Sequence, residues 1–328
     1  MQNYFKSLLK EAVDSNSTDI YLLPDEEHYQ IKFHDGSRPR SFRIISKLIA
    51  TKLFSFLKFR AQMNITENRR PQMGSMDWPL DKQNLSLRIS TVGDFKNQET
   101  MVIRILYDRE IHNLVWLKKE QFSHLKQIIP SHGLVVVAGP TGSGKTSTIH
   151  ELLREYASDK LVLTIEDPVE IKNSRFVQLQ VNQHASMTYL DLIKVALRHH
   201  SDILLIGEIR DSQTAQATIQ AALSGHLVFS TIHANSASTV GNRLLELGVD
   251  KTLLKDVLKV TIYQRLLQQV NGSLAAIADW KEDWQILDQP TSDFGSSWKE
   301  VLDGAFKSKR ISSKVYEEYK KNCRVGNR

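Results

Sequence analysis

The spacing of apolar residues predicts an antiparallel sheet in the first third of the chain. Short runs there alternate apolar and polar positions, the pattern of strands with one face in the core and one in solvent. The predicted strands are Thr18–Leu23, His28–Phe33, Ser75–Pro79, Leu85–Thr91 and Met101–Leu106. Helical spacing of apolar residues predicts helices over Tyr4–Ser15 and Ser46–Lys58. The Asp35-Gly36 pair predicts a tight hairpin turn, and polar Gly93–Thr100 a hairpin loop.

The pattern changes after a polar, irregular stretch, Asp108–Leu117. Beyond a predicted helix, Lys119–Ile129, short and nearly continuous apolar runs alternate with helical stretches. Such runs are typical of parallel strands whose sheet is covered by helices on both faces. The predicted strands are Leu134–Ala138, Leu161–Ile165, Ile203–Ile206 and Leu227–Thr231. From Asp250 on, the pattern predicts helices followed by a polar tail.

The length of the chain and its two patterns together indicate two domains. The chain has 328 residues, and about 100–200 residues per domain is usual. We assign an α+β domain to residues 1–108, a linker to residues 109–118 and an α/β domain to residues 119–328. The C-terminal helices are expected from about residue 250.

One glycine-rich segment has the pattern of a nucleotide-binding loop. Residues 139–146 fit G-x-x-x-x-G-K-[ST] and lie between a predicted strand and a predicted helix, Thr146–Tyr156. Glycines let backbone N–H groups surround phosphate oxygens, and the helix N-terminus adds positive potential. Lys145 is expected to reach the β- and γ-phosphates of ATP, and the Thr146 hydroxyl to bind Mg²⁺. The residues assigned to nucleotide binding are Gly139, Pro140, Thr141, Gly142, Ser143, Gly144, Lys145, Thr146 and Ser147.

Two glutamates follow predicted strands, at the edge where a parallel sheet meets its ligand. Glu166 follows Leu161–Ile165 and precedes Pro168, and Glu208 comes shortly after Ile203–Ile206. We expect Glu166 to orient or deprotonate the attacking water, and Glu208 to hold Mg²⁺ through water or to act as the base. The pattern leaves open which glutamate is the base. Together the two indicate ATP hydrolysis rather than nucleotide binding alone.

Other charged residues beside these glutamates have two interpretations each. Asp167 and Glu170 fit a catalytic role and equally fit turn and capping positions. Arg210 is a catalytic candidate, but Arg210 and Asp211 also fit a structural ion pair with each other.

Two histidines flank the predicted strand Leu227–Thr231. His226 precedes it and His233 follows it. The strand between them separates the two residues by roughly 20 Å, which is too far for one metal ion. A single histidine in such a place is more often a packed or capping residue than a catalytic one. We favour γ-phosphate sensing by His233, with His226 as the lesser candidate.

Composition narrows the remaining possibilities. The formal net charge of +6 comes from 43 basic and 37 acidic residues that are interspersed, so it identifies neither nucleic acid nor a membrane as a partner. No groove of interleaved aromatic and basic residues is visible, so direct nucleic-acid binding is not expected. One cysteine, Cys323, forms no internal disulfide and no cysteine-based zinc site. No run approaches 18 apolar residues, which predicts at most a peripheral association with a membrane.

The order of these motifs resembles the secretion ATPases of type II secretion, type IV pili and competence pseudopili. Residues 139–146, 164–170, 207–211 and 225–233 correspond to that family's Walker A loop, Asp box, Walker B and His box. The resemblance extends to Ser17–Ile20, to residues 65–74 and to Gln264–Leu266, which matches a helix of the family downstream of the His box. It implies an α/β fold, a RecA-like P-loop NTPase domain preceded by a PAS-like α+β domain, in a ring-shaped homo-hexamer.

The same resemblance assigns Arg88 and Arg104 to catalysis. Both lie on predicted strands that match the family's arginine-bearing strands. In a ring they would reach a γ-phosphate held by a neighbouring RecA-like domain. An arginine that meets the spread negative charge of this transition state can be worth about 10³–10⁵ in rate. Because both alternate with apolar neighbours, ordinary surface positions on a sheet are the other interpretation.

Departures from the family pattern favour one branch. Extension enzymes usually carry an extra N-terminal domain and a four-cysteine zinc subdomain, whereas this chain is expected to start at the PAS-like domain and to bind no zinc. Retraction enzymes typically carry an Ala-Ile-Arg-Asn-Leu-Ile-like motif near the C-terminus, which is absent here. The chain is therefore most similar to the ATPases of competence pseudopili.

This branch implies a particular role. The expected protein is a cytoplasmic motor, peripheral to the cytoplasmic face of the cell membrane, that powers assembly of a competence pseudopilus for DNA uptake. Its expected partner is a polytopic inner-membrane platform protein. A retraction motor, a type II secretion ATPase and a nucleic-acid-dependent RecA-like ATPase or helicase are the alternatives.

Overall fold

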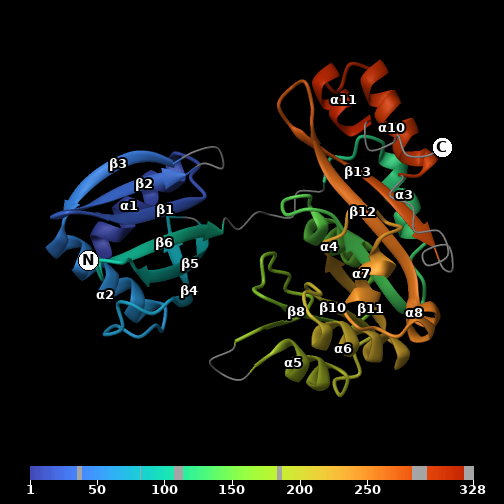
Figure 1. Cartoon of the computed structure of the whole chain (residues 1–328), viewed down its shortest axis with the longest axis horizontal. Coiled ribbons are helices and arrows are strands. Elements are labelled where there is room, and N and C mark those ends of the chain that lie inside the picture. The colour runs from blue at the N-terminus through green and yellow to red at the C-terminus, as the bar shows by residue number, and fades with distance from the viewer. Residues whose placement is uncertain (35–38, 82, 107–113, 183–186, 283–293, 321–328) are drawn as a thin grey trace. The chain divides into compact units, whose positions relative to one another are not determined.

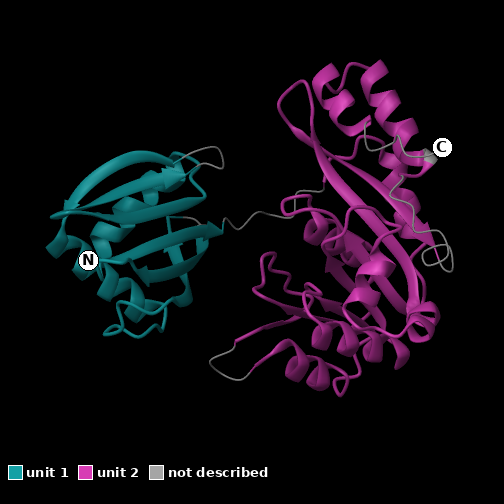
Figure 2. Cartoon of the chain, in the orientation of Figure 1, with its two compact units in different colours: residues 1–110 teal, residues 111–328 magenta. Residues whose placement is uncertain are grey.

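In the computed structural model, the chain forms two units, Met1–Glu110 (unit 1) and Ile111–Arg328 (unit 2) (Figure 2). The structure describes residues 1–34, 39–81, 83–106, 114–182, 187–282 and 294–320. The predicted Asp35-Gly36 turn, much of the predicted linker and Cys323 lie outside these residues. Within the described ranges, no helix is long and apolar enough to cross a membrane.

Unit 1 is built on an antiparallel sheet with the strand order β3-β2-β1-β6-β5-β4 (Figure 1). The strands are β1 (Asp19–Asp25), β2 (His28–His34), β3 (Pro39–Ser46), β4 (Gln72–Leu80), β5 (Gln83–Gly93) and β6 (Glu99–Leu106). Helices α1 (Gln2–Asp14) and α2 (Lys47–Arg60) share one apolar core with this sheet. The predicted antiparallel sheet is confirmed. Strand β3 was not predicted, because its residues are largely exposed at an edge and only Ile45 is buried.

Unit 2 contains a mixed sheet with the strand order β13-β12-β7-β11-β10-β8-β9. The strands are β7 (Gly133–Ala138), β8 (Val162–Glu166), β9 (Val177–Gln180), β10 (Ile203–Ile206), β11 (Leu227–Ile232), β12 (Leu258–Gln268) and β13 (Leu274–Glu282). The helices are α3 (Lys119–Gln127), α4 (Lys145–Tyr156), α5 (Tyr189–Ala196), α6 (Ser212–Leu223), α7 (Val240–Glu246), α8 (Lys251–Val257), α10 (Ser296–Lys307) and α11 (Ser313–Lys320). Neighbouring strands pair in parallel, except that β13 runs antiparallel to β12.

Strand β7 shows that helices cover both faces of this sheet. Val135 and Val137 belong to an apolar cluster with α3 and α4, whereas Leu134 and Val136 belong to a second cluster with α5, α6 and α8. Alternate side chains of a strand point to opposite faces, so one strand contributes to both cores. The predicted central strands and their two-sided cover are confirmed. The carboxyl ends of β7, β8, β10 and β11 meet at one edge.

The C-terminal part of unit 2 differs from the prediction. Helices were predicted from Asp250 on, but after α8 the chain forms the long hairpin β12–β13, followed by α10 and α11 (Figure 1). Gln264–Leu266, expected on a helix, lies on β12. An apolar run of this kind supports either a buried helix or a buried strand. Here the pairing of β12 with β7 stabilises the strand, and this long-range pairing could not be predicted from the local pattern of residues.

Candidate functional site

The glycine-rich segment forms a loop between β7 and α4. Strand β7 ends at Ala138 and α4 begins at Lys145, which is the predicted strand–loop–helix arrangement. Gly144 has a φ of +83°, a left-handed conformation that glycine adopts at low cost. Gly139 has a φ of +148°, and a Cβ atom there would lie 2.5 Å from the carbonyl oxygen of Gln264. Both glycines therefore allow the loop to lie close against β12.

The side chain of Lys145 reaches back across this loop. Its Nζ donates to the carbonyl oxygen of Gly139 at 2.9 Å and to that of Pro140 at 3.0 Å. Burial lowers the pKa of Lys145, and the carboxylates of Glu208 and Glu170 partly offset this effect. The ammonium group thus lies among the loop carbonyls and within electrostatic reach of two glutamates.

Glu208 is the centre of a charged cluster beyond the end of β10. Its Oε2 accepts a hydrogen bond from Nε of Arg210 at 2.8 Å. Its Oε1 lies 3.1 Å from Nε2 of His233, which follows β11. Strands β10 and β11 are parallel neighbours, so their carboxyl ends deliver these residues to the same edge. The structure therefore brings together Glu208 and Arg210 of one motif and His233 of the next motif along the chain.

Arg210 and Asp211 do not pair with each other, which corrects one of the two interpretations of this pair. Arg210 binds Glu208 instead. Asp211 caps α6: its Oδ1 accepts from the backbone N–H of Thr214 at 2.8 Å, and its Oδ2 from the Thr214 hydroxyl at 3.1 Å. A carboxylate at a helix N-terminus is satisfied by the free N–H groups there, which leaves the guanidinium to Glu208.

Glu166, the last residue of β8, is buried and held by neutral partners. Its Oε1 accepts from the Thr164 hydroxyl at 2.6 Å and from Nε2 of Gln178 at 3.3 Å. Its Oε2 lies 3.8 Å from Nε2 of His150 on α4. The two predicted glutamates therefore differ in environment: Glu208 is partly exposed and lies against Arg210 and His233, whereas Glu166 lies inside a buried polar cluster.

His226 is not brought to this cluster. It precedes β11, and its carbonyl oxygen accepts from the backbone N–H of Gly133, the first residue of β7, at 3.0 Å. The phosphate loop follows the last residue of β7, so the length of a strand separates His226 from it. His226 lies at the amino edge of the sheet, whereas His233 lies at the carboxyl edge.

Arg88 and Arg104 lie opposite each other on β5 and β6 of unit 1. The Nε of Arg104 donates to Oδ1 of the buried Asp19 at 2.7 Å, while 59% of the Arg104 side chain is exposed. Like charges directly opposite on neighbouring strands destabilise a sheet. Asp19 offsets that repulsion and fixes the direction of Arg104.

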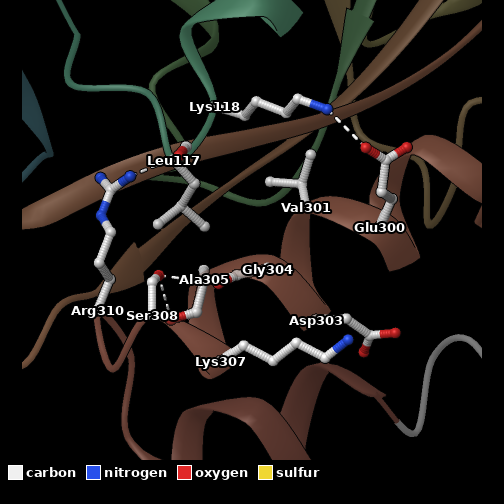
Figure 3. Close-up of a pocket in the computed structure, with 10 residues that line it drawn as sticks. All are labelled: Leu117, Lys118, Glu300, Val301, Asp303, Gly304, Ala305, Lys307, Ser308 and Arg310. Atoms are coloured by element: carbon white, nitrogen blue, oxygen red, sulfur yellow. Dashed lines mark hydrogen bonds and ion pairs between the residues drawn. The ribbon is translucent and has the colours of Figure 1, made fainter.

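Described residues of unit 2 line a smaller and a larger hollow on its surface. The smaller, about 350 Å³, adjoins the charged cluster and is lined by Glu208, Ile209, Arg210, Ile232, His233 and Arg243. The larger, about 470 Å³, lies along α10, where Lys118 binds Glu300 and Arg310 donates to the carbonyl oxygen of Leu117 (Figure 3). The residues that line the larger hollow include none of the predicted site residues. We therefore place the candidate site at the loop and the smaller hollow.

Comparison with protein families decides the class of this protein. The family described as type II/IV secretion system protein matches residues 1–304. The chain belongs to this family. The resemblance drawn from the four motifs is thereby confirmed, and the glycine-rich loop, Glu166, Glu208 and His233 all lie inside the matched range.

Curated relatives place this secretion ATPase near the competence proteins of the family. It is 39% identical to competence protein ComGA of Streptococcus pneumoniae strain R6 over 313 residues, which cover 95% of this chain and 96% of the relative. It is 35% identical to competence protein ComGA of Bacillus subtilis strain 168 over 268 residues, covering 80% and 75%. The putative type II secretion system protein E of Escherichia coli K12 is 34% identical, but the match covers only 54% of that relative.

Solved structures show the same fold. The ATPase DotB of Legionella pneumophila has a TM-score of 0.72 at 20% identity, covering 97% of this chain and 95% of the other. The pilus retraction motor PilT with bound ADP has a TM-score of 0.73 at 21% identity, covering 95% and 96%. The secretion ATPase described here therefore shares an α/β fold with DotB and PilT.

Three further side chains of this secretion ATPase were not identified from its sequence. Gln178 and His150 contact Glu166 from β9 and α4. Tyr189 begins α5, and a Cβ atom on Gly207 would lie 3.2 Å from its hydroxyl oxygen. Burial and the nearby Asp167 raise the pKa of Tyr189, so this phenol stays protonated. The local sequence signal for this contact was Gly207, directly before Glu208, because a glycine allows the Tyr189 hydroxyl to approach the backbone.

Proposed function

We propose that this secretion ATPase hydrolyses ATP at residues 139–147 and powers assembly of a competence pseudopilus for DNA uptake. The convergence of Lys145, Glu208, Arg210 and His233 at the carboxyl edge of one sheet is the observation that supports hydrolysis most strongly. Similarity to ComGA of Streptococcus pneumoniae over 95% of the chain supports the competence role.

In this proposal, different side chains at the edge of the sheet bind different phosphates of ATP. Lys145 exchanges the carbonyl oxygens of Gly139 and Pro140 for the β- and γ-phosphates, which are stronger acceptors because they are charged. His233 and Arg210 both contact the carboxylate of Glu208. The γ-phosphate would therefore compete with this carboxylate for contacts to the two side chains. This competition makes the cluster sensitive to whether the γ-phosphate is present.

The residues present fit a magnesium ion. Thr146 is the second residue of α4, directly after Lys145, and its side chain is only partly buried. Mg²⁺ prefers oxygen ligands and keeps several waters. We assign the Thr146 hydroxyl as a direct ligand and Glu208 as a ligand through water. A bound Mg²⁺ neutralises charge that develops on the phosphates.

The proposed enzyme is a homo-hexameric ring in which residues 1–108 form the PAS-like domain and residues 119–328 the RecA-like domain. Arg88 and Arg104 of one protomer act on the nucleotide of the next. The exposure of Arg104 and its fixed direction on Asp19 support this role. The ring works in the cytoplasm against a polytopic inner-membrane platform protein, and ATP, ADP and empty states favour different arrangements of the domains.

The Lys145→Ala variant tests the site. ATP turnover by the purified protein should fall by at least about 10²-fold, because the group that neutralises the phosphates is lost. Lys307→Ala, which removes an exposed lysine of α10 in the same unit, should keep wild-type turnover. Undiminished ATPase activity of Lys145→Ala would refute the assignment. DNA uptake by cells that carry Lys145→Ala should be lost, and uptake at the wild-type level would reject the competence role.

Conservative variants separate the two candidate bases. Glu166→Gln and Glu208→Gln keep the shape of the side chain and remove its negative charge. The variant that binds ATP normally but does not hydrolyse it identifies the base. A variant that loses binding only when Mg²⁺ is present identifies the ligand of the metal.

A type II secretion role is the second candidate. Type II secretion system protein E of Klebsiella pneumoniae is 36% identical over 80% of this chain, although the match covers 54% of that relative. Loss of a secreted protein from the medium, with DNA uptake intact, would favour this role.

A further inference from the structure

Gln264 belongs to a motif that the proposed chemistry leaves unexplained. It lies on β12, which pairs in parallel with β7, the strand that leads into the phosphate loop. Tyr263 of β12 is the register partner of Ala138, the last residue of β7. Gln264 therefore lies beside the beginning of the loop, and its side chain is fully buried.

The side-chain amide of Gln264 bridges the end of the loop and the first turn of α4. Its Nε2 donates to the carbonyl oxygen of Ser143 at 2.7 Å. Its Oε1 accepts from the hydroxyl of Thr148 at 2.6 Å. A carbonyl oxygen only accepts, so the NH₂ group of the amide must be the end that faces Ser143.

This bond controls the direction of the next backbone N–H group. In a trans peptide the carbonyl oxygen and the following N–H point in opposite directions. Because the Ser143 carbonyl points at Gln264, the N–H of Gly144 points away from β12. The Gln264 amide also fills the space on the β12 side: a Cβ atom on Gly144 would lie 2.9 Å from its Nε2. An anion can therefore reach this N–H only from the side opposite β12.

We propose that Gln264 is a positioning residue for phosphate binding, which holds the Ser143–Gly144 peptide with its N–H presented to the nucleotide. Without this bond the peptide is free to rotate, and the loop must be ordered when the ligand binds. Ordering during binding lowers affinity, whereas a loop ordered in advance does not incur that loss. This inference rests on the proposed binding of nucleotide at residues 139–147.

A buried amide that only stabilises the fold is the competing explanation, and the chain contains a matched control. Gln121 on α3 is also buried. Its Nε2 donates to the carbonyl oxygen of Ala278 on β13 at 2.7 Å, and its Oε1 accepts from the N–H of Ala278 at 3.3 Å. It thus ties a helix to the other strand of the same hairpin, through residues outside the phosphate loop.

The experiment measures ADP affinity by calorimetry and thermal unfolding for Gln264→Met and Gln121→Met in the full chain. Both variants should lower the melting temperature. Gln264→Met should weaken ADP binding by about tenfold or more, because a backbone donor to a charged group is misdirected. Gln121→Met should bind ADP as the wild type does. Equal ADP affinity of wild type and Gln264→Met, or an equal loss in Gln121→Met, overturns the inference.

Gln264→Glu adds a readout that a purely structural role would not move. The ionised carboxylate of this variant would present an acceptor to the Ser143 carbonyl, whereas the protonated carboxyl restores a donor. The ADP affinity of the variant relative to wild type at the same pH should therefore rise as the pH falls from about 8 to about 5.5, since the protonated fraction grows over that range. A ratio that does not change with pH counts against the inference. Failure of the wild type itself to bind ADP would instead reject the proposed function.

Discussion

Asp279 shows how burial changes the chemistry of a single side chain. It lies on β13 with 1% of its surface exposed, and its Oδ1 accepts from the backbone N–H of Gly295 at 3.0 Å. Among the described residues, its Oδ2 has no hydrogen-bond partner. Burial raises the pKa of Asp279 to about 6, against the weaker opposing effect of the Gly295 N–H. The folded state therefore binds a proton here at a pH where the unfolded chain has released it.

The sign of the resulting pH dependence follows from linkage. Because the folded pKa of Asp279 lies above the unfolded value of 3.8, its effect is a loss of stability as the pH rises from about 4 to about 6. The loss is at most roughly 3 kcal/mol, since each pKa unit corresponds to about 1.4 kcal/mol. Asp279→Asn should remove this dependence, so its stability relative to the wild type should be greater at pH 7.5 than at pH 4. Urea unfolding at both pH values measures the difference.

The exposed Asp256 on α8 is the control for this measurement. Asp256→Asn should leave the free energy of unfolding nearly unchanged, because water solvates an exposed carboxylate. If Asp279→Asn behaves in the same way, the buried carboxyl does not titrate as described.

At the scale of elements, the connection between α2 and β4 packs tightly against the rest of unit 1. The buried Lys58 pairs with Glu99 of β6 at 2.5 Å and donates to the carbonyl oxygen of Glu67 at 2.8 Å. Gly74 of β4 packs directly against the residues that follow α2. A Cβ atom on Gly74 would lie 2.6 Å from the carbonyl oxygen of Ala61, so there is no room for a side chain. The glycine is thus needed for the approach of the chain after α2.

Two glycine-to-alanine variants should have opposite effects on stability. Gly74→Ala should lower the free energy of unfolding by about 1–3 kcal/mol, because a backbone atom must move to admit the methyl group. Gly304→Ala should raise it by about 0.5–1 kcal/mol, because Gly304 lies inside α10 with no atom near a new Cβ, and alanine favours helix. Thermal unfolding of both variants followed by circular dichroism measures this, and stabilisation by Gly74→Ala would contradict the packing.

At the scale of the whole molecule, the proposed catalytic residues are divided between the units. Arg88 and Arg104 belong to unit 1, and Lys145 and Glu208 to unit 2. Unit 1 also carries a row of register partners across its sheet: His34, Asp19, Arg104, Arg88 and Ser75 on five adjacent strands. In a ring, head-to-tail contacts repeat the same juxtaposition at every interface.

Co-expression of two inactive variants tests this division. Arg104→Ala and Lys145→Ala should each lack ATPase activity, but mixed rings should regain it, because about one interface in four would combine an intact arginine with an intact phosphate loop. Lys145→Ala mixed with Glu208→Gln is the control, since both changes lie in the same nucleotide site and should not complement. Absence of activity in the first mixture would indicate that Arg104 does not act across an interface.

The sequence by itself determined the features whose physical cause is local. The phosphate loop needs glycines between a strand and a helix. Glu166 is the last residue of its strand, and Glu208 follows its strand after Gly207. Because the strands are parallel, these residues had to meet at one edge, and Glu208 and His233 lie 3.1 Å apart there. The antiparallel sheet of unit 1 was likewise predictable, since alternation along a strand records which face is buried.

Only the tertiary structure decided the contacts that join distant segments. Arg210 pairs with Glu208 because the N–H groups at the N-terminus of α6 already satisfy Asp211. Gln264 lies more than a hundred residues after Ser143, and it reaches that carbonyl only because β12 pairs with β7. The residues of an apolar run do not specify which strand it pairs with, so the hairpin β12–β13 was predicted as helix. The direction of the Gly144 N–H depends on the pairing of β12 with β7, so it could not be inferred from the sequence.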